Sequence, residues 1–263
     1  MGPTEHWLLL TGGGFLIGLL VGSTGVGAGS LTTPMLISGF GVPPMIAVGT
    51  DLLFASITKA SAAWRHQKLG NVDWKILRGL VTGSLSGALA VFGWLYLAKP
   101  DTLALALTIR QGLGVALLAS AASIVVYPWI AKRRGDHGPP PEVIGNRTPM
   151  VVGLGVILGS LVALTSVGAG AIGVVALISL YPAMTTRRLI GTDIVHAIPL
   201  TFVCGFGHLG MGNVDGAVLV ALLAGSVPGI AIGSRATGML PDWVLRAVLA
   251  CVLLVAAGLV WPK

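Results

Sequence analysis

The chain is poor in charged residues. Asp, Glu, Lys and Arg make up 10% of its 263 residues, whereas apolar residues make up 54%. A soluble domain carries about 25% charged residues, so this composition excludes a water-exposed surface and leaves lipid to cover most of the exterior. A transmembrane helix needs about 20 mostly apolar residues. Windows such as 76–97, 103–126 and 244–260 meet that requirement, which predicts a multi-pass membrane protein.

The sequence also lacks the patterns of metal, redox and nucleic-acid binding sites. The two cysteines, Cys204 and Cys251, lie inside apolar runs without the spacing of a metal or redox site. We therefore expect no metal and no cofactor. The net charge is +7, but no basic face alternates with aromatic residues, so we expect no nucleic acid as a partner. The basic residues instead occupy short loops between apolar runs, as in cytoplasmic loops of membrane proteins.

The sequence repeats itself after about 142 residues. The matching segments are TGVGAG at 24–29 with TSVGAG at 165–170, GTD at 49–51 and 191–193, His66 with His208, GNVD at 70–73 and 212–215, and GSLSG at 83–87 with GSVPG at 225–229. Chance does not place five matches in the same order. We predict two membrane repeats, 1–131 and 149–263, joined by a polar linker at 132–148. Such repeats are typical of secondary transporters and of several channels.

Each repeat reads as a broken element followed by three full helices. The expected legs of the broken elements are 7–22 and 31–40, then 150–164 and 172–181. The expected full helices are 44–64, 74–97 and 101–127, then 188–207, 216–235 and 242–261. Legs of about 16 and about 10 residues extend ~24 and ~15 Å, short of the ~30 Å hydrocarbon core. We predict an all-α membrane protein in which each repeat is a re-entrant hairpin plus three transmembrane helices.

The distribution of Lys and Arg favours inverted repeats. If the broken element crosses the membrane, nine basic residues lie on one side and five on the other. If it is re-entrant, the second repeat is upside down, and the counts become twelve inside and two outside. Because cytoplasmic loops carry the excess of Lys and Arg, we expect six spanning helices, two hairpins, a cytoplasmic linker and both termini in the periplasm. If the first legs count as spans, the number is seven or eight.

The two glycine breaks are the candidate binding elements. A helix interrupted at membrane depth is tolerated only against protein or a watery cavity, and its free N–H groups and dipole form an anion site. Two inverted breaks would meet near the midplane. The other use of small residues is close helix packing, which we favour for Gly79, Gly83 and Gly87. The predicted substrate contacts are Thr24, Gly25, Val26, Gly27, Ala28 and Gly29 in the first break, and Thr165, Ser166, Val167, Gly168, Ala169 and Gly170 in the second.

Asp51 and Asp193 occupy equivalent positions inside predicted spans, where a carboxylate costs at least ~2.5 kcal/mol. Two roles stay open for them: proton coupling, and a clamp in which the carboxylate accepts backbone N–H hydrogen bonds from the nearby break. If they couple protons, Asp51→Asn and Asp193→Asn both abolish coupled transport. His196 shares the face of Asp193 at i+3, and is either a proton relay or a buried histidine satisfied by a neighbour.

Other ionisable side chains have more than one interpretation. Lys59 lies too far along the helix from Asp51 for a direct pair, and either contacts the anion or snorkels to the cytoplasmic face. Arg110 is expected to snorkel. His66 and His208, at helix ends, are expected to be interfacial.

The segments GGGFLIGLLVGSTGVGAGSLTTPML at 12–36, AVGTDLL at 47–53 and GNVDW at 70–74 resemble the TauE/SafE family of sulfite exporters, also called the 4-toluene sulfonate uptake permease family. The resemblance extends over nearly the whole chain. It implies transport of sulfite, thiosulfate or small organosulfonates across a bacterial inner membrane, as export or import. Proton coupling is commonly supposed for this family.

The sequence suggests three functions. The first is a secondary transporter that exports a small sulfur anion by alternating access. The anion would be held between the breaks by backbone N–H groups, Thr50, Thr192 and Lys59. The alternative is a passive anion channel with paired half-helices. An intramembrane hydrolase would use Ser166 with His196, but no nucleophile motif surrounds Ser166, so we expect no enzyme. The expected partners are the anion and the lipid bilayer, for a monomer or homodimer.

Overall fold

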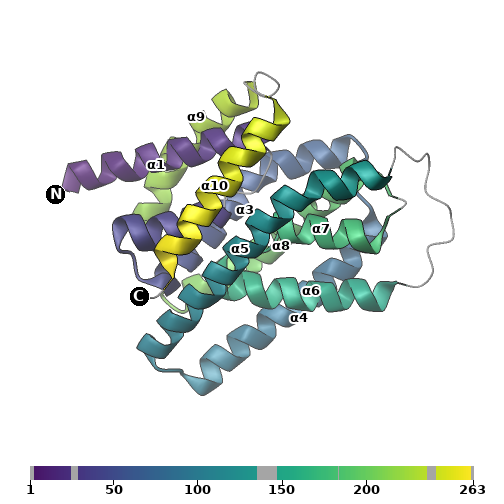
Figure 1. Ribbon diagram of the computed structural model, residues 1–263. Coiled ribbons are helices and arrows are strands. Elements are labelled where there is room, and N and C mark those ends of the chain that lie inside the picture. Colours follow the sequence, from purple (N-terminus) through teal and green to yellow (C-terminus); the bar gives the residue numbers. More distant parts are fainter. Residues whose placement is uncertain (1–2, 25–28, 135–146, 183, 236–240, 262–263) are drawn as a thin grey trace.

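The computed structural model describes residues 3–24, 29–134, 147–182, 184–235 and 241–261, and all regular secondary structure in them is helical (Figure 1). The helices are α1 (Pro3–Thr24), α2 (Gly29–Pro34), the π-helix η1 (Met35–Gly39), α3 (Pro44–Lys68), α4 (Trp74–Ala98), α5 (Thr102–Arg134), α6 (Thr148–Thr165), α7 (Ala171–Leu180), α8 (Thr186–Gly210), α9 (Gly216–Arg235) and α10 (Asp242–Val260). The predicted all-α class is confirmed for these residues.

Eight of the described helices are long and apolar enough to cross a membrane, where the sequence predicts six. The two additional helices are α1 and α6, the first legs of the broken elements. The predicted first leg was too short because α1 begins at Pro3 rather than Trp7, and its 22 residues extend ~33 Å. The second leg α7 has only 10 residues. Each repeat therefore pairs a long leg with a short one.

Aspartate side chains cap three of the long helices. Oδ1 of Asp73 accepts hydrogen bonds from the N–H groups of Lys75 and Ile76 at the start of α4. Asp215 caps α9 in the same way, and Asp101 caps α5 through Oδ2. Each cap satisfies N–H groups that the first turn of a helix leaves free. The GNVD motif thus ends with the cap of the following helix in both repeats.

The first helix of each repeat packs against a helix of the other repeat. α1 lies along α9, and α6 lies along α4. Because α1 corresponds to α6, and α4 to α9, this is one contact made twice. The remaining large contacts join equivalent helices, α3 with α8 and α5 with α10. The pattern is that of an approximate two-fold axis that passes between α3 and α8.

Helices α1 and α9 run parallel, as do α6 and α4. Gly155 of α6 lies against Leu80 of α4, and Gly159, one turn later, lies against Ser84, also one turn later. The contacts of α1 on α9 keep the same order. A Cβ added at Gly83 would overlap a carbonyl oxygen of α6. The predicted close-packing role of the α4 glycines is therefore confirmed.

The central pair runs antiparallel. Gly49, near the start of α3, lies against His208, near the end of α8. Gly191, near the start of α8, lies against His66, near the end of α3. A two-fold axis that relates two antiparallel helices runs across them rather than along them. In Figure 1, α1 begins and α10 ends toward the left, whereas α5 ends and α6 begins at the right.

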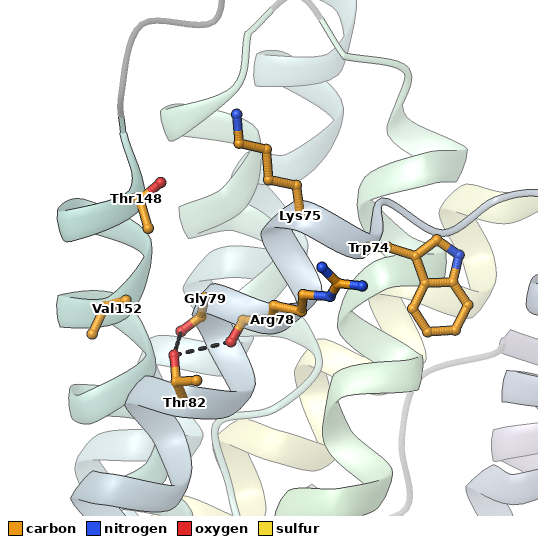
Figure 2. A pocket seen from close by; sticks show the side chains of 7 residues that line it. All are labelled: Trp74, Lys75, Arg78, Gly79, Thr82, Thr148 and Val152. Atoms are coloured by element: carbon orange, nitrogen blue, oxygen red, sulfur yellow. Dashed lines mark hydrogen bonds between the residues drawn. The ribbon is translucent and has the colours of Figure 1, made fainter.

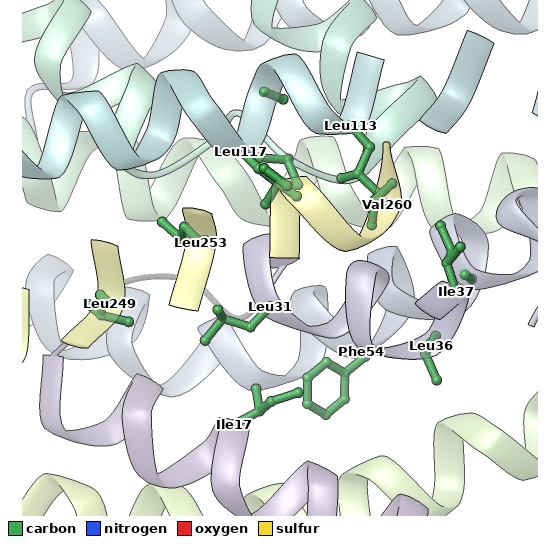
Figure 3. Packing of buried hydrophobic residues seen from close by; sticks show 14 of the residues in the cluster. Ile17, Leu31, Leu36, Ile37, Phe54, Leu113, Leu117, Leu249, Leu253 and Val260 are labelled. Carbon is green, nitrogen blue, oxygen red and sulfur yellow. The ribbon is translucent and has the colours of Figure 1, made fainter. Parts of the chain in front are cut away.

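A hydrophobic cluster encloses the short helices of the first repeat (Figure 3). Leu31 of α2 and Leu36 of η1 are buried with Phe54 of α3. Leu117 of α5 and Leu253 of α10 close the cluster. Broken backbone at membrane depth must be shielded from lipid, and here neighbouring helices provide that shield.

Candidate functional site

The second glycine break turns the chain sharply inside the bundle. α6 ends at Thr165, and Ser166 follows in the left-handed region with φ of 60°. Gly168 and Gly170 have φ of 138° and 139°, a conformation that glycine adopts readily and L side chains rarely do. These two glycines are therefore required by the turn, after which α7 begins at Ala171.

The start of α7 presents free backbone donors. The first backbone bonds of this helix run from Gly173 N–H to the Gly168 carbonyl and from Val174 N–H to the Gly170 carbonyl. The N–H groups of Ala171 and Ile172 precede that ladder. Together with the positive end of the helix dipole, they favour negative charge at this point.

In this break the Thr165 hydroxyl forms hydrogen bonds within the turn, whereas the Ser166 hydroxyl is available to bind a ligand. The Thr165 hydroxyl donates to the Leu161 carbonyl at 2.7 Å and accepts from Val167 N–H at 3.2 Å. Ser166 is 6% exposed, and its hydroxyl has no hydrogen-bond partner among the described residues. It lies near Asp51 of α3 but outside hydrogen-bonding geometry.

The first break is described only at its edges. Thr24 is the last residue of α1, and Gly29 is the first residue of α2. The predicted contacts at Gly25, Val26, Gly27 and Ala28 lie outside the described residues. The structural account of the site therefore comes from the second break and from the helices that surround it.

Asp51 is held by the short helix of its own repeat. The residue is fully buried in α3, and its Oδ2 accepts a hydrogen bond from the Thr33 hydroxyl of α2 at 2.6 Å. The Thr32 hydroxyl lies near the same carboxylate. Asp51 thus joins α3 to the second leg, through side-chain hydroxyls instead of the backbone N–H groups that the clamp hypothesis invokes.

Asp193, its counterpart in α8, has no such partner. It is 1% exposed, and neither carboxylate oxygen makes a hydrogen bond within the part of the chain that the structure describes. Oδ1 lies directly against Gly173, in the first turn of α7, because a Cβ added there would overlap it. A buried carboxylate without partners is costly, so this position needs a functional explanation.

Lys59 links the two carboxylates to the second break. It is 8% exposed in α3, and its Nζ donates to the Ala169 carbonyl at 3.3 Å. It interacts electrostatically with both Asp193 and Asp51 but forms a direct ion pair with neither, as its spacing from Asp51 predicts. Lys59 is therefore buried inside the bundle and does not snorkel to the surface.

The difference between the two aspartates lies in the short helices. Thr32 and Thr33 of α2 correspond to Gly173 and Val174 of α7, which have no hydroxyl to offer. The repeat alignment contained this signal, but only the structure shows that these positions face the aspartates. Thr33 and Gly173 are the site residues that sequence reasoning missed.

His196 is satisfied on one side only. Its Nε2 lies 2.9 Å from the Ser84 hydroxyl of α4, which ties α8 to the other repeat. Its Nδ1 has no described partner, and the ring lies close enough to Lys59 for an electrostatic interaction. No hydrogen bond joins His196 to Asp193 in the structure. A role of His196 in proton coupling stays a prediction.

The Thr50 and Thr192 hydroxyls join the two repeats. The Thr50 hydroxyl accepts a hydrogen bond from Asp215 N–H at 3.0 Å, and the Thr192 hydroxyl accepts one from Asp73 N–H at 2.9 Å. Each GTD motif is thus bound to the GNVD motif of the other repeat. At one of these two joints Asp73 also pairs with Arg188 at 3.1 Å.

The predicted interfacial position of His208 is wrong. Its side chain is fully buried, and Nε2 lies 2.9 Å from the Ala163 carbonyl of α6. The ring also packs edge-on against Phe92 of α4. The histidine occupies a helix end in the sequence, but the packing of the two repeats against each other covers that end with α4 and α6.

The arrangement combines hydrogen-bond donors, one cation and one unpartnered carboxylate in a buried position. The backbone donors of α7, the Ser166 hydroxyl and the Lys59 ammonium suit a small anion. The Asp193 carboxylate suits a proton. Among the described residues, no group of three or more His, Cys, Asp or Glu side chains is placed to hold a metal ion.

Comparison with known proteins agrees with a transport role. The chain matches the family described as sulfite exporter TauE/SafE over residues 10–260. The chain belongs to the TauE/SafE family. It is a multi-pass membrane protein and a membrane transporter, which is the coarse function that this family carries.

Relatives of this TauE/SafE protein are named as transporters without a substrate. It is 34% identical to the probable membrane transporter protein YjnA of Bacillus subtilis, over 92% of this chain and 95% of the relative. It is 28% identical to the probable membrane transporter protein YdhB of the same organism, over 89% and 91%. The probable membrane transporter protein MJ0441 of Methanocaldococcus jannaschii is 28% identical, over 77% and 72%. No solved structure matches the chain significantly.

Proposed function

We propose that the protein is a secondary transporter of a small sulfur-containing anion, such as sulfite, thiosulfate or an organosulfonate, which binds at the second break. The observation that carries this proposal is that buried Lys59 reaches the second break through the Ala169 carbonyl. In the same break the Ser166 hydroxyl has no described partner and α7 begins. The family membership supplies the sulfur anion. The geometry of the second break supports this position for the anion.

The charges around this point couple the anion to a proton. Lys59 carries one positive charge against the two carboxylates of Asp51 and Asp193, so the ionised cluster is net negative by one charge, with His196 as the remaining titratable neighbour. An added anion at roughly 5 Å from a carboxylate is opposed by about 3 kcal/mol at an effective dielectric constant of about 20. One proton on the cluster removes that opposition.

Asp193 is the proposed proton acceptor, and Asp51 the proposed clamp. Oδ2 of Asp51 accepts a hydrogen bond from the Thr33 hydroxyl, whereas neither oxygen of Asp193 has a described partner and Oδ1 lies against Gly173 in the first turn of α7. The two roles left open by the sequence are thus divided between the two copies. A proton bound together with the anion moves in the same direction as the anion. Export therefore proceeds when the outward anion gradient exceeds the inward proton gradient.

We further propose that the repeats are inverted in a bacterial inner membrane, with both termini in the periplasm. The antiparallel pairing of α3 and α8 supports this orientation, because repeats related by an axis along the membrane normal would place them parallel. A long first leg and a short returning leg give the same Lys and Arg distribution as a hairpin. The excess of Lys and Arg on one side of the membrane therefore still favours a cytoplasmic linker, although α1 is longer than the sequence predicts.

Cysteine labelling tests this orientation. Pro43 and Thr185 are equivalent helix N-caps, and both are exposed. In a Cys251→Ser background, Pro43→Cys is expected to react with a membrane-impermeant maleimide added to intact cells, and Thr185→Cys only after the cells are opened. Reaction of both cysteines from the same side would contradict the inverted arrangement.

Lys59→Met tests the anion site. Because a hydrogen bond to a charged group contributes roughly 1.5–3 kcal/mol, we expect sulfite affinity of the purified protein to fall about 10- to 100-fold. The measurement is isothermal titration together with sulfite uptake into proteoliposomes. Arg110→Met, which removes a cation from α5 outside the cluster, is the matched control and should keep wild-type affinity. Equal affinity in both variants and wild type would remove Lys59 from the site.

The same liposomes separate a transporter from a passive channel. A transporter accumulates sulfite against its gradient when a pH gradient is imposed. A flux that no pH or sodium gradient can drive uphill would favour the channel with paired half-helices.

A further inference from the structure

A hollow between the starts of α4 and α6 lies outside the proposed transport site (Figure 2). Its lining residues are Trp74, Lys75, Arg78, Gly79, Thr82, Thr148 and Val152. It opens at the surface of the bundle, at the end where α6 begins. That end carries most of the basic residues, and under the proposed orientation it faces the cytoplasm.

Two cations of this hollow have no partner in the described structure. Lys75 and Arg78 are exposed, lie one turn apart on α4, and make no side-chain hydrogen bond or ion pair with a described residue. In Figure 2, Lys75 extends toward the end of the bundle and Arg78 extends toward Trp74. No acidic residue lines the hollow. The nearest carboxylate along the chain, Asp73, is engaged with Arg188 and with the cap of α4.

The hollow lies where a membrane boundary is expected. Trp74, 52% exposed at the first residue of α4, has the amphipathic ring that prefers the level of lipid headgroups. Further along the same helix faces, α4 exposes Leu89 and α6 exposes Val156. A cationic hollow thus continues into an apolar surface that faces lipid, and these are the two halves of a phospholipid site.

The second repeat lacks this chemistry. The α9 positions that correspond to Trp74, Lys75 and Arg78 are Gly216, Ala217 and Val220. The fold repeats the helix pair, but the sequence supplies these cations in only one of the two pairs. The positive charge of Lys75 and Arg78 is therefore specific to the hollow between α4 and α6 and is not a consequence of the duplication.

We propose that the hollow binds the headgroup of an anionic phospholipid, with Lys75 and Arg78 on its phosphate and Trp74 at the headgroup level. The acyl chains lie along the exposed apolar faces of α4 and α6. Basic pockets between transmembrane helices on the cytoplasmic side bind such headgroups. The assignment to the cytoplasmic leaflet rests on the proposed orientation, whereas the binding itself does not.

The test uses the purified full chain in detergent, titrated with phosphatidylglycerol and with phosphatidylcholine. Bound lipid is measured by native mass spectrometry, and the unfolding midpoint by thermal scanning. We expect phosphatidylglycerol to bind and to raise the midpoint. The double variant Lys75→Gln/Arg78→Gln should weaken that binding about 30-fold, since each basic residue near an anionic surface contributes about 1 kcal/mol.

The matched control is Lys68→Gln/Arg235→Gln, which removes two exposed cations outside the hollow. This control should bind phosphatidylglycerol as the wild type does. Equal binding of phosphatidylcholine, or unchanged binding by the Lys75/Arg78 variant, would overturn the proposal. Inorganic phosphate is the second probe: displacement of the lipid by millimolar phosphate would identify a site for free anions, and would overturn the lipid assignment.

Discussion

The Asp193→Asn variant is expected to bind sulfite at high pH about 100-fold more tightly than the wild type and to lose uphill transport driven by a pH gradient. The neutral amide resembles the protonated carboxyl group, so the repulsion of about 3 kcal/mol that opposes the anion at roughly 5 Å is removed. Wild-type affinity should fall as pH rises and Asp193 loses its proton, whereas the affinity of the variant should stay constant. Isothermal titration across pH and proteoliposome uptake measure the two effects.

Asp51→Asn is the matched variant, because it changes the same group at the equivalent position of the first repeat. An asparagine oxygen still accepts the hydrogen bond that Thr33 donates to Asp51. We therefore expect Asp51→Asn to retain both the pH dependence of binding and uphill transport, which differs from the sequence-based expectation that both variants lose coupling. Loss of pH dependence in Asp51→Asn with its retention in Asp193→Asn would reverse the assignment.

Gly159→Ala is expected to destabilise the protein by about 3 kcal/mol or more, because overpacking at a rigid contact shifts backbone rather than a side chain. A Cβ at this position would overlap the backbone of Ser84 in α4. The duplication predicts the same effect for Gly18→Ala, whose Cβ would overlap the backbone of Ser226 in α9. The thermal unfolding midpoint and the monodisperse yield in detergent measure the loss.

Gly153→Ala and Gly12→Ala are the controls for these two variants. They lie on the same helices, α6 and α1, and a Cβ at either position meets nothing within 4 Å. Alanine is also a better helix former than glycine by about 1 kcal/mol, so these variants should be neutral or slightly stabilised. Equal loss in all four variants would show that helix flexibility, not close packing, explains the glycines.

The sequence predicted the general position of the site better than its residues. It identified the glycine breaks, the buried aspartates and Lys59, because glycine and charge are rare signals inside an apolar helix. It placed Thr50 and Thr192 at the anion, whereas both hydroxyls bind the GNVD motif of the opposite repeat. A motif shared by two repeats marks an important contact, but the sequence does not say whether that contact is with a ligand or with the other repeat.

The length of α1 shows a similar limit. The apolar pattern begins at Trp7, but the helix begins at Pro3, since proline at the first helical position and polar residues in the first turn do not interrupt a helix. The number of long helices therefore rises from six to eight. Hydropathy detects the apolar part of a helix, and helix ends are set by capping and packing.

By itself, the sequence determined that this is a duplicated, helical membrane protein of the TauE/SafE family with a glycine break in each repeat. Composition and spacing carry that information because lipid demands apolar helices and repeats preserve order. Only the tertiary structure decided which aspartate accepts a hydrogen bond from the short helix of its own repeat. Asp51 and Asp193 are the same residue in the same motif, and they differ because Thr33 faces one and Gly173 faces the other. The distinction depends on contacts between separate helices, which no single repeat contains.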